Sequence, residues 1–198
     1  EGERARVSRL AQAVFAAGPG VVQLRAKTVS TGVFEEVAAT LCRDAAACGC
    51  ALIVNDRCDV ALATGAAGVH LGDEDLDPRQ ARLLLGAKAL IGYSTHSLED
   101  VQAAAALPVD YIGFGPVLES PTKPGVRRAR GFDALAAACR AAVQPVVAIG
   151  GLTLGDAERV WRAGATSVAV ISELERTRDP AATLREFLRR ARTLGPAG

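Results

Sequence analysis

Short apolar runs rich in β-branched residues recur along the chain at nearly regular intervals. They are GVVQL at 20–24, ALIV at 51–54, GVHL at 68–71, LIGY at 90–93, DYIGF at 110–114, PVVAIG at 145–150 and SVAVIS at 167–172. Runs of this kind, bounded by glycine and polar residues, are typical of strands buried on both faces of a parallel sheet. We therefore expect seven strands.

Alanine-rich amphipathic segments separate these runs and predict helices. They are residues 33–48, 78–86, 98–106, 131–142, 153–163 and 180–193. Asp77 before Pro78 predicts a helix N-cap with proline at the first helical position, and Ser97 is expected to cap the next helix. Repeated strand–helix alternation predicts an α/β fold, either an open doubly wound sheet or a closed (β/α)8 barrel.

The barrel is favoured because no strand is followed by the G-x-G-x-x-G fingerprint of the dinucleotide-binding open sheet. Seven strands are one short of a TIM barrel, and the chain opens with the helix-like RVSRLAQAVFAAG. We therefore expect a first strand that precedes residue 1 and is missing from this chain. No linker or low-complexity tract divides the sequence, so residues 1–198 are expected to form a single TIM-barrel domain.

The composition narrows the setting of the protein. A formal net charge of +1 argues against binding to nucleic acid through a basic surface. Five cysteines form an odd set without a C-x-x-C pair, which favours reduced thiols over disulfides and makes a zinc site improbable. No apolar run approaches the length of a membrane span. We expect a cytoplasmic protein without membrane partners, with homo-oligomerisation left open.

Polar side chains follow the predicted strands, where a (β/α)8 barrel places its active site. Gln23, Arg25 and Lys27 follow the first run. Two cations there suit a phosphate-rich ligand, since guanidinium and ammonium groups form charge-assisted hydrogen bonds with its oxygens. A solvated loop is the alternative interpretation.

Carboxylates follow the second and third runs. Asn55 and Asp56 end one, and GDEDLDP, which contains Asp75, follows the other. Asp56 and Asp75 are predicted to bind Mg²⁺, which takes one or two carboxylates together with waters and substrate phosphate oxygens. The acidic stretch also fits a solvated loop, which is why Asp73 and Glu74 are weaker candidates.

The remaining strand ends carry hydroxyls, imidazoles and glycines. Ser94 and His96 follow the fourth run, but no G-x-S-x-G elbow accompanies them. His70, inside an apolar run, fits a hydrogen-bonded core residue better than a catalyst. AIGG at 148–151 and VIS at 170–172, taken as the end of the last strand, favour phosphate binding through backbone N–H groups.

Together, QLRAK, ND, GVHLGDEDL, IGYSTHS, DYIGFGPVLESPTKP, AIGG and VAVIS resemble the thiamine phosphate synthase family, in order from Gln23 to Ser172. The resemblance implies a (β/α)8 barrel and a transferase. Its reaction joins hydroxymethylpyrimidine pyrophosphate to hydroxyethylthiazole phosphate by a dissociative, Mg²⁺-assisted substitution that releases pyrophosphate. Such a reaction needs charge stabilisation and positioning more than proton transfer.

The resemblance also implies roles for individual residues. The pyrimidine pyrophosphate would be held by Gln23, Arg25, Lys27, Asn55, Ser94 and Lys123. Of these, Arg25, Lys27, Ser94 and Lys123 would act as catalytic residues. Asp56 and Asp75 would hold the metal. The thiazole phosphate would be held by Ser120, Thr122, Gly151, Ile171 and Ser172.

The chain departs from the family pattern at a few positions. Ser120 stands where the family usually has threonine, and Asp73 where glutamine is common. The loop also carries Arg127, Arg128 and Arg130, which fit either closure over phosphates or a solvated surface. A thiazole tautomerase on the same barrel and a non-catalytic phosphate-binding regulatory barrel are the alternative functions.

Overall fold

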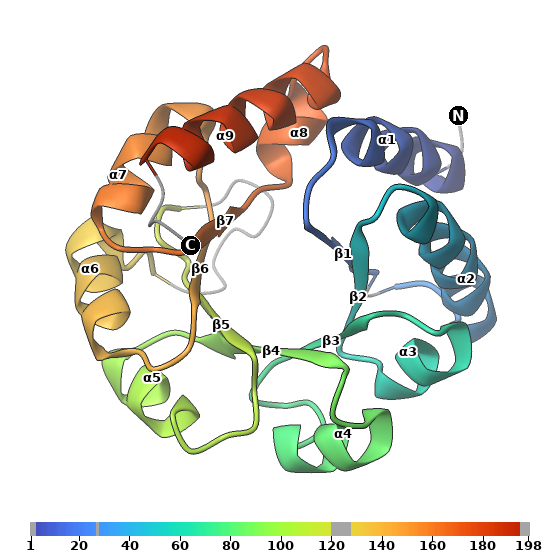
Figure 1. Ribbon diagram of the computed structural model, residues 1–198, viewed down its shortest axis with the longest axis horizontal. Helices are drawn as coiled ribbons and strands as arrows, with labels where there is room; N and C mark the ends of the chain where they lie inside the picture. Colours follow the sequence, from blue (N-terminus) through green and yellow to red (C-terminus); the bar gives the residue numbers. More distant parts are fainter. Residues whose placement is uncertain (1–2, 27, 120–127, 195–198) are drawn as a thin grey trace. The chain divides into compact units, whose positions relative to one another are not determined.

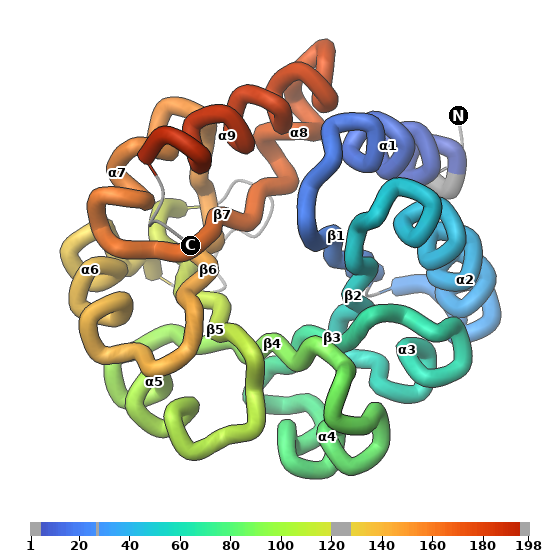
Figure 2. The backbone as a smooth tube through the Cα atoms, viewed as in Figure 1, coloured from blue at the N-terminus to red at the C-terminus, as the bar shows by residue number. Residues whose placement is uncertain are grey.

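The computed structural model describes residues 3–26, 28–119 and 128–194, with the side chains of Glu3 and Arg4 left out. The chain divides into two compact units, residues 1–93 and residues 94–198. In both units the chain alternates between strand and helix (Figure 2).

The first unit contains strands β1 (Val21–Leu24), β2 (Ala51–Asn55) and β3 (Gly68–Leu71), with β4 (Leu90–Thr95) running from it into the second unit. The strands pair in parallel in the order β1-β2-β3-β4, with Val22 opposite Leu52 and Val69 opposite Ile91. The helices are α1 (Glu3–Ala17), α2 (Thr31–Ala47), α3 (Cys58–Thr64) and α4 (Pro78–Leu85). They lie on one side of β1–β3 in Figure 1.

The core of the first unit forms where these helices pack on the strands. Phe15 of α1, Phe34 and Leu41 of α2, and Leu52 and Val54 of β2 belong to one buried apolar cluster. Ile53, between the last two, is also fully buried. A strand buried on both faces needs a continuous apolar sequence, which explains why ALIV lacks polar alternation.

The second unit contains the end of β4 and strands β5 (Tyr111–Phe114), β6 (Val146–Ile149) and β7 (Ser167–Ala169). These strands neighbour one another in sequence order, and β5, β6 and β7 pair in parallel. Gly115 N donates to Thr95 O at 3.2 Å, which joins the chain after β5 to β4. The helices are α5 (Leu98–Ala104), α6 (Gly131–Ala141), the 3-10 turn η1 (Leu154–Asp156), α7 (Ala157–Arg162), α8 (Ser172–Arg176) and α9 (Pro180–Leu194).

The buried side chains of the second unit come from both strands and helices. Ile112 and Phe114 of β5, Leu135 of α6, Val160 of α7 and Phe187 of α9 are all buried. Burial of large apolar side chains of this kind contributes about 1.5–3 kcal/mol each. The apolar stripes of the helices therefore face the strands, as the amphipathic sequences predicted.

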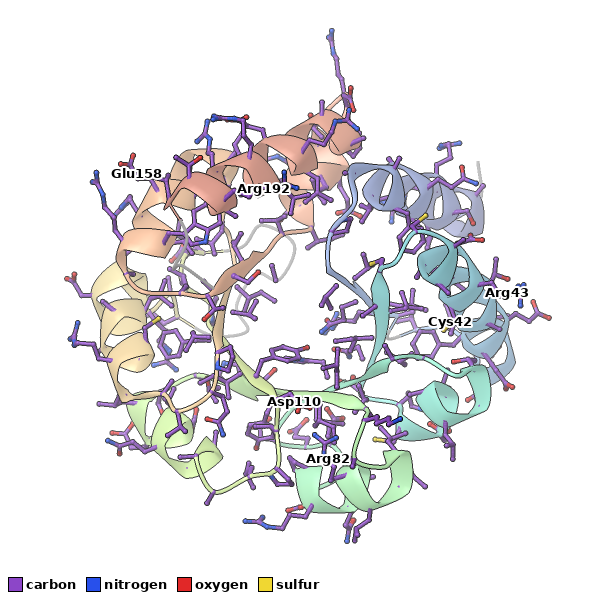
Figure 3. All side chains as sticks on the ribbon, in the orientation of Figure 1. Cys42, Arg43, Arg82, Asp110, Glu158 and Arg192 are labelled. Carbon is purple, nitrogen blue, oxygen red and sulfur yellow. The ribbon has the colours of Figure 1, made fainter. Side chains whose placement is uncertain are left out.

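The α/β fold with seven parallel strands is confirmed, and so are both predicted caps. Asp77 Oδ1 accepts from Arg79 N at 2.7 Å with Pro78 in the first turn. Ser97 Oγ accepts from Asp100 N at 3.1 Å in a capping box. At the other end of α4, Arg82 donates to three carbonyls of the following loop (Figure 3).

The prediction for the last strand was wrong at its end. The strand stops at Ala169, and Ser172 begins α8 instead of ending β7. Ile171 turns the chain with φ −136° and ψ −60°, which is not an extended conformation. An apolar run cannot by itself mark where such a turn falls, and the short helices α3 and α8 were missed for the same reason.

The five cysteines are free thiols in the structure. Burial raises the pKa of Cys139 to about 11, so this thiol stays protonated near neutral pH. No helix in the described ranges is long and apolar enough to cross a membrane.

Candidate active site

A tight turn at the end of β2 carries two of the predicted site residues. Asn55 ends the strand and is 9% exposed. Asp56 follows with φ 64°, the one positive φ at a non-glycine position in the described chain. Arg57 N donates to Asn55 O at 2.8 Å across it, which makes a γ-turn. Such a conformation is uncommon outside glycine, and strained backbone of this kind gathers at functional sites.

The β2–α3 turn is fastened to the neighbouring strand. Asp56 N donates to His70 O in β3 at 2.9 Å, so the hydrogen-bond ladder continues one residue past the end of β2. The backbone of Asp56 is thereby fixed on both sides. Its carboxylate stands at the carboxyl end of the β2–β3 pair, where ligand-binding residues are expected in parallel sheets.

Asp75 lies in the turn that follows β3. Its Oδ2 accepts from Gly72 N at 2.7 Å, and its own N–H donates to Gly72 O at 3.3 Å. One carboxylate oxygen is thus held by its own turn, which sets the orientation of the carboxylate. Asp73 and Glu74 in the same turn are exposed.

The turns after β2 and β3 are neighbours, since Asp56 N bonds to His70 O, and Asp75 influences titratable groups near both. Burial lowers the pKa of His70 to about 4, against the opposing effect of the Asp75 carboxylate. The pKa of Cys58, at the start of α3, is raised by burial first and then by Asp59 and Asp75. Asp75 therefore acts on groups from both strand ends, and His70 is neutral at pH 7.

The two carboxylates suit a magnesium ion better than a metal caged by protein. Within residues 3–26, 28–119 and 128–194, no group of three His, Cys, Asp or Glu side chains is placed to hold a metal. Asp56 and Asp75 at adjacent strand ends match the donor set of Mg²⁺, which keeps waters and takes substrate phosphate oxygens as further ligands.

The end of β1 supplies polar side chains to the same unit. Gln23 lies in β1 and Arg25 directly after it, and both are exposed. The segment after them leads to Thr31, the first residue of α2. Thr31 Oγ1 accepts from Arg57 at 3.2 Å, which connects the start of α2 to the β2–α3 turn.

In the second unit, glycines let two backbone segments approach closely. Val117 N donates to Ile149 O at 2.9 Å, and Leu118 N donates to Gly150 O at 3.0 Å. A Cβ on Gly151 would lie 2.3 Å from Glu119 O, and φ there is 65°. The lack of a side chain at Gly151 is therefore required for its packing against Leu118 and Glu119, at the end of the 115–119 segment.

Thr95 at the end of β4 and His96 after it hold β5 and the residue that follows it. Thr95 is fully buried and its Oγ1 donates to Gly113 O at 3.1 Å. His96 Nδ1 lies 2.6 Å from Gly115 O, so this nitrogen carries the proton that the carbonyl accepts. Ser94, the predicted pyrophosphate ligand, is half-buried just before them in β4.

A second hydrogen bond brings the turn after β6 next to the start of α8. Leu154 N in η1 donates to Glu173 Oε1 at 3.2 Å. Glu173 follows Ser172, and Leu154 lies three residues after Gly151. Gly151, Ile171 and Ser172 thus lie on two connected turns, with Ile171 exposed and Ser172 half-buried.

The sequence matches a known protein family. The sequence model described as thiamine monophosphate synthase matches residues 1–174. The chain belongs to this family. Thiamine-phosphate synthase of Albidiferax ferrireducens is 46% identical over 174 residues, which covers 86% of this chain and 80% of the relative. Thiamine-phosphate synthase of Thermosynechococcus vestitus is 41% identical over 185 residues, covering 93% of this chain and 52% of the relative.

Solved structures agree with the family. Thiamine phosphate pyrophosphorylase from Pyrococcus furiosus superposes with a TM-score of 0.86 at 29% identity, covering 98% of this chain and 91% of that one. A 3-hexulose-6-phosphate synthase superposes with a TM-score of 0.71 at 18% identity, covering 94% of each chain, which shows likeness of fold alone. The chain therefore has a TIM-barrel-like α/β fold.

Several residues expected to act in a thiamine monophosphate synthase lie outside the described residues, and their roles stay predictions. They are Lys27, Ser120, Thr122 and Lys123. Arg127 also lies outside, whereas Arg128 and Arg130 are exposed beside it.

Sequence reasoning missed some residues that shape this family member's site. Arg57 was not singled out, although the spacing in NDRCD, an arginine two residues before an aspartate at a helix start, could have indicated its ion pair. Thr95 was not chosen as a site residue, since a buried hydroxyl that holds the backbone has no sequence signature of its own.

Proposed function

We propose that this protein is a thiamine-phosphate synthase. It joins hydroxymethylpyrimidine pyrophosphate to hydroxyethylthiazole phosphate, giving thiamine phosphate and pyrophosphate. The observation that carries the proposal is the pair of carboxylates, Asp56 and Asp75, on neighbouring turns of a chain 46% identical to a thiamine-phosphate synthase. Carboxylates of this kind suit the magnesium ion of a metal pyrophosphate.

Asp56 and Asp75 would hold Mg²⁺. The bound ion would neutralise charge on the departing pyrophosphate and fix its position. The protein prepares these carboxylates before any ligand arrives, since Asp56 is fixed by its γ-turn and Asp75 by its bond to Gly72 N. Such preorganisation avoids the cost of ordering the groups during the reaction.

The remaining polar residues would bind the two substrates. Gln23, Arg25, Lys27, Asn55, Ser94 and Lys123 would hold the pyrimidine pyrophosphate, with the cations offsetting its negative charge. Gly151, Ile171 and Ser172, together with Ser120 and Thr122, would hold the thiazole phosphate. The connection between the turn after β6 and α8 supports this second set.

The reaction asks for little proton transfer, and the described groups agree with that demand. His70 is neutral at pH 7 because burial lowers its pKa to about 4. His96 uses Nδ1 to hold Gly115 O. These imidazoles therefore serve structure, and catalysis rests on charge and positioning.

The proposal includes a complete (β/α)8 barrel and a single domain. The support is the seven strands in sequence order with helices between them. It also includes a cytoplasmic location, which the free thiols favour.

No observation favours the two alternatives. A thiazole tautomerase has no use for a magnesium pyrophosphate site, and a regulatory barrel has no need to maintain a strained Asp56 turn. The relatives reported above carry the synthase name.

Pyrophosphate release tests the function directly. With both substrates and Mg²⁺, the protein should release pyrophosphate and form thiamine phosphate, and EDTA should stop the reaction. Asp75→Asn should cut the rate by well over ~10-fold, because a metal ligand is lost. Metal-independent isomerisation of the thiazole without pyrophosphate release would establish the tautomerase, and binding without turnover the regulatory barrel.

A further inference from the structure

Arg57 occupies a central place among the turns of the first unit. Its Nε donates to Asp59 Oδ1 at 2.8 Å and its Nη2 to Asp59 Oδ2 at 2.5 Å. Its Nη1 donates to Thr31 Oγ1 at 3.2 Å. Each of the three guanidinium nitrogens thus has a protein partner.

These partners make Arg57 poorly suited to bind phosphate. A guanidinium whose planar fork is already paired with a carboxylate has little left to offer a pyrophosphate. The hydrogen bond to Arg57 is the first cause that lowers the pKa of Asp59, and the same bond raises the pKa of Arg57. Both groups are therefore charged throughout the physiological range.

Arg57 contacts several turns of the first unit through its backbone and its side chain. Its backbone N–H closes the γ-turn over Asp56, and its backbone carbonyl accepts from Ala61 N to begin α3. Its side chain then reaches across to the first residue of α2. One residue thereby joins the strained Asp56 turn, the start of α3 and the segment that leads from Arg25 to α2.

We propose that Arg57 is a positioning residue that locks the Asp56 carboxylate in its metal-binding orientation and ties that turn to the start of α2. The inference rests on the proposed function, because it takes Asp56 as a ligand of Mg²⁺. Arg57 itself touches neither metal nor substrate.

The ion pair between Arg57 and Asp59 is too exposed to contribute much to the free energy of folding. The side chains of Arg57 and Asp59 are 37% and 64% exposed. Exposed pairs contribute little to folding, since water and salt screen them. The effect of Arg57 should therefore appear in the site and leave the unfolding temperature nearly unchanged.

Electrostatics and positioning predict opposite results for removal of the side chain. By Coulomb's law, removing a positive charge beside a cation site strengthens cation binding. Loss of a residue that orients a metal ligand instead weakens cation binding, by roughly 10- to 100-fold when that residue supports the ligand without touching the metal. The sign of the change therefore decides between a bystander charge and a positioning residue.

The test is Mn²⁺ binding to the purified chain, measured by the paramagnetic resonance of free Mn²⁺ with and without inorganic pyrophosphate. Arg57→Ala should weaken Mn²⁺ binding about 10-fold. Arg57→Lys, which keeps the charge and loses the fork, should remain weakened. Arg162→Ala is the matched control: it breaks an exposed ion pair to Glu158 on α7 and should bind Mn²⁺ as the parent does (Figure 3).

Each outcome has one meaning. Mn²⁺ binding by Arg57→Ala as tight as or tighter than the parent overturns the positioning role while the proposed function stands. A parent that binds no Mn²⁺ overturns the metal site and this inference with it. A parent that binds Mn²⁺, loses it on Arg57→Ala and yet forms no thiamine phosphate overturns the function alone. If Arg57→Ala does not fold, Arg57→Lys gives the same decision.

Discussion

Of the turns that hold the backbone at positive φ, one in each unit lies at a predicted site residue, and the two do so for different reasons. In the first unit the residue is Asp56, with φ 64°, and a glycine there would avoid the strain. In the second unit the residues are Gly150 and Gly151, with φ 100° and 65°, where a side chain would collide with neighbouring backbone.

At Asp56 the positive φ is associated with a side chain needed for the proposed reaction, whereas at Gly150 and Gly151 it is associated with close backbone packing. An aspartate at positive φ costs about 1–3 kcal/mol, and it persists when surrounding structure determines it. Here the carboxylate is the group that the proposed reaction needs. At Gly150 and Gly151, by contrast, the absence of a side chain is what lets the 115–119 segment pack.

Asp56→Gly should have the largest effect on activity, and it tests whether the strained turn serves the reaction. Glycine accepts the turn without strain, so the free energy of unfolding should stay equal to that of the parent or rise by up to about 1 kcal/mol. The rate of thiamine phosphate formation should fall by well over ~10-fold, since a metal ligand is lost. Urea unfolding and the coupled pyrophosphate assay measure the two effects on the same preparation.

Asp56→Asn gives the matched control for that variant. Asparagine keeps the side-chain shape and the backbone strain but removes the charge. The variant should therefore form thiamine phosphate slowly, and its free energy of unfolding should not rise. A glycine variant that retained parental activity would mean that the strained turn serves structure, and Asp56 would leave the proposed site.

Gly151→Ala should have the next largest effect, and it acts on folding. The new Cβ would meet Glu119 O at 2.3 Å in a conformation that alanine rarely adopts. We expect a loss of about 3 kcal/mol in the free energy of unfolding. Thermal and urea unfolding measure it.

Gly155→Ala is the control for this change. A Cβ there would lie 3.5 Å from Thr153 Oγ1, an ordinary contact, and φ is not positive. Equal stability of the two alanine variants would show that the turn after β6 can move, and the packing explanation for Gly151 would be wrong.

The pH dependence of stability gives the smallest expected effect and reports on the first unit. His70 has a folded pKa of about 4, below its ordinary value of 6.5, because it is buried. Below pH 6.5 the unfolded chain binds more protons at this residue, so stability falls as the pH falls toward 4. Between pH 7 and pH 5 the loss should be about 2 kcal/mol.

Urea unfolding at both pH values, without added metal, measures this dependence. His70→Gln should remove that part of the slope. An unchanged slope in the variant would show that the half-buried His70 is accessible to protons in the folded protein, which contradicts the desolvation that lowers its pKa.

Much of the fold could be predicted from the sequence, because it depends on local pattern. Buried parallel strands need continuous apolar runs, and helices between them need one apolar face, so the seven strands and most helices were read correctly. Asp77 and Ser97 as caps were equally readable, since a cap depends on a few adjacent residues. The end of β7 and helices α3 and α8 were not, because short turns depend on their tertiary surroundings.

By itself, the sequence determined the class of fold, the family and the residue types that follow each strand. Only the tertiary structure decided how those residues are held. The γ-turn at Asp56 is joined to β3 by the bond from Asp56 N to His70 O. The requirement for Gly151 comes from the backbone of residues 118 and 119, and the hydrogen bond of Arg57 reaches a threonine 26 positions earlier. Contacts between residues distant in sequence leave no periodic signal, so packing alone reveals them.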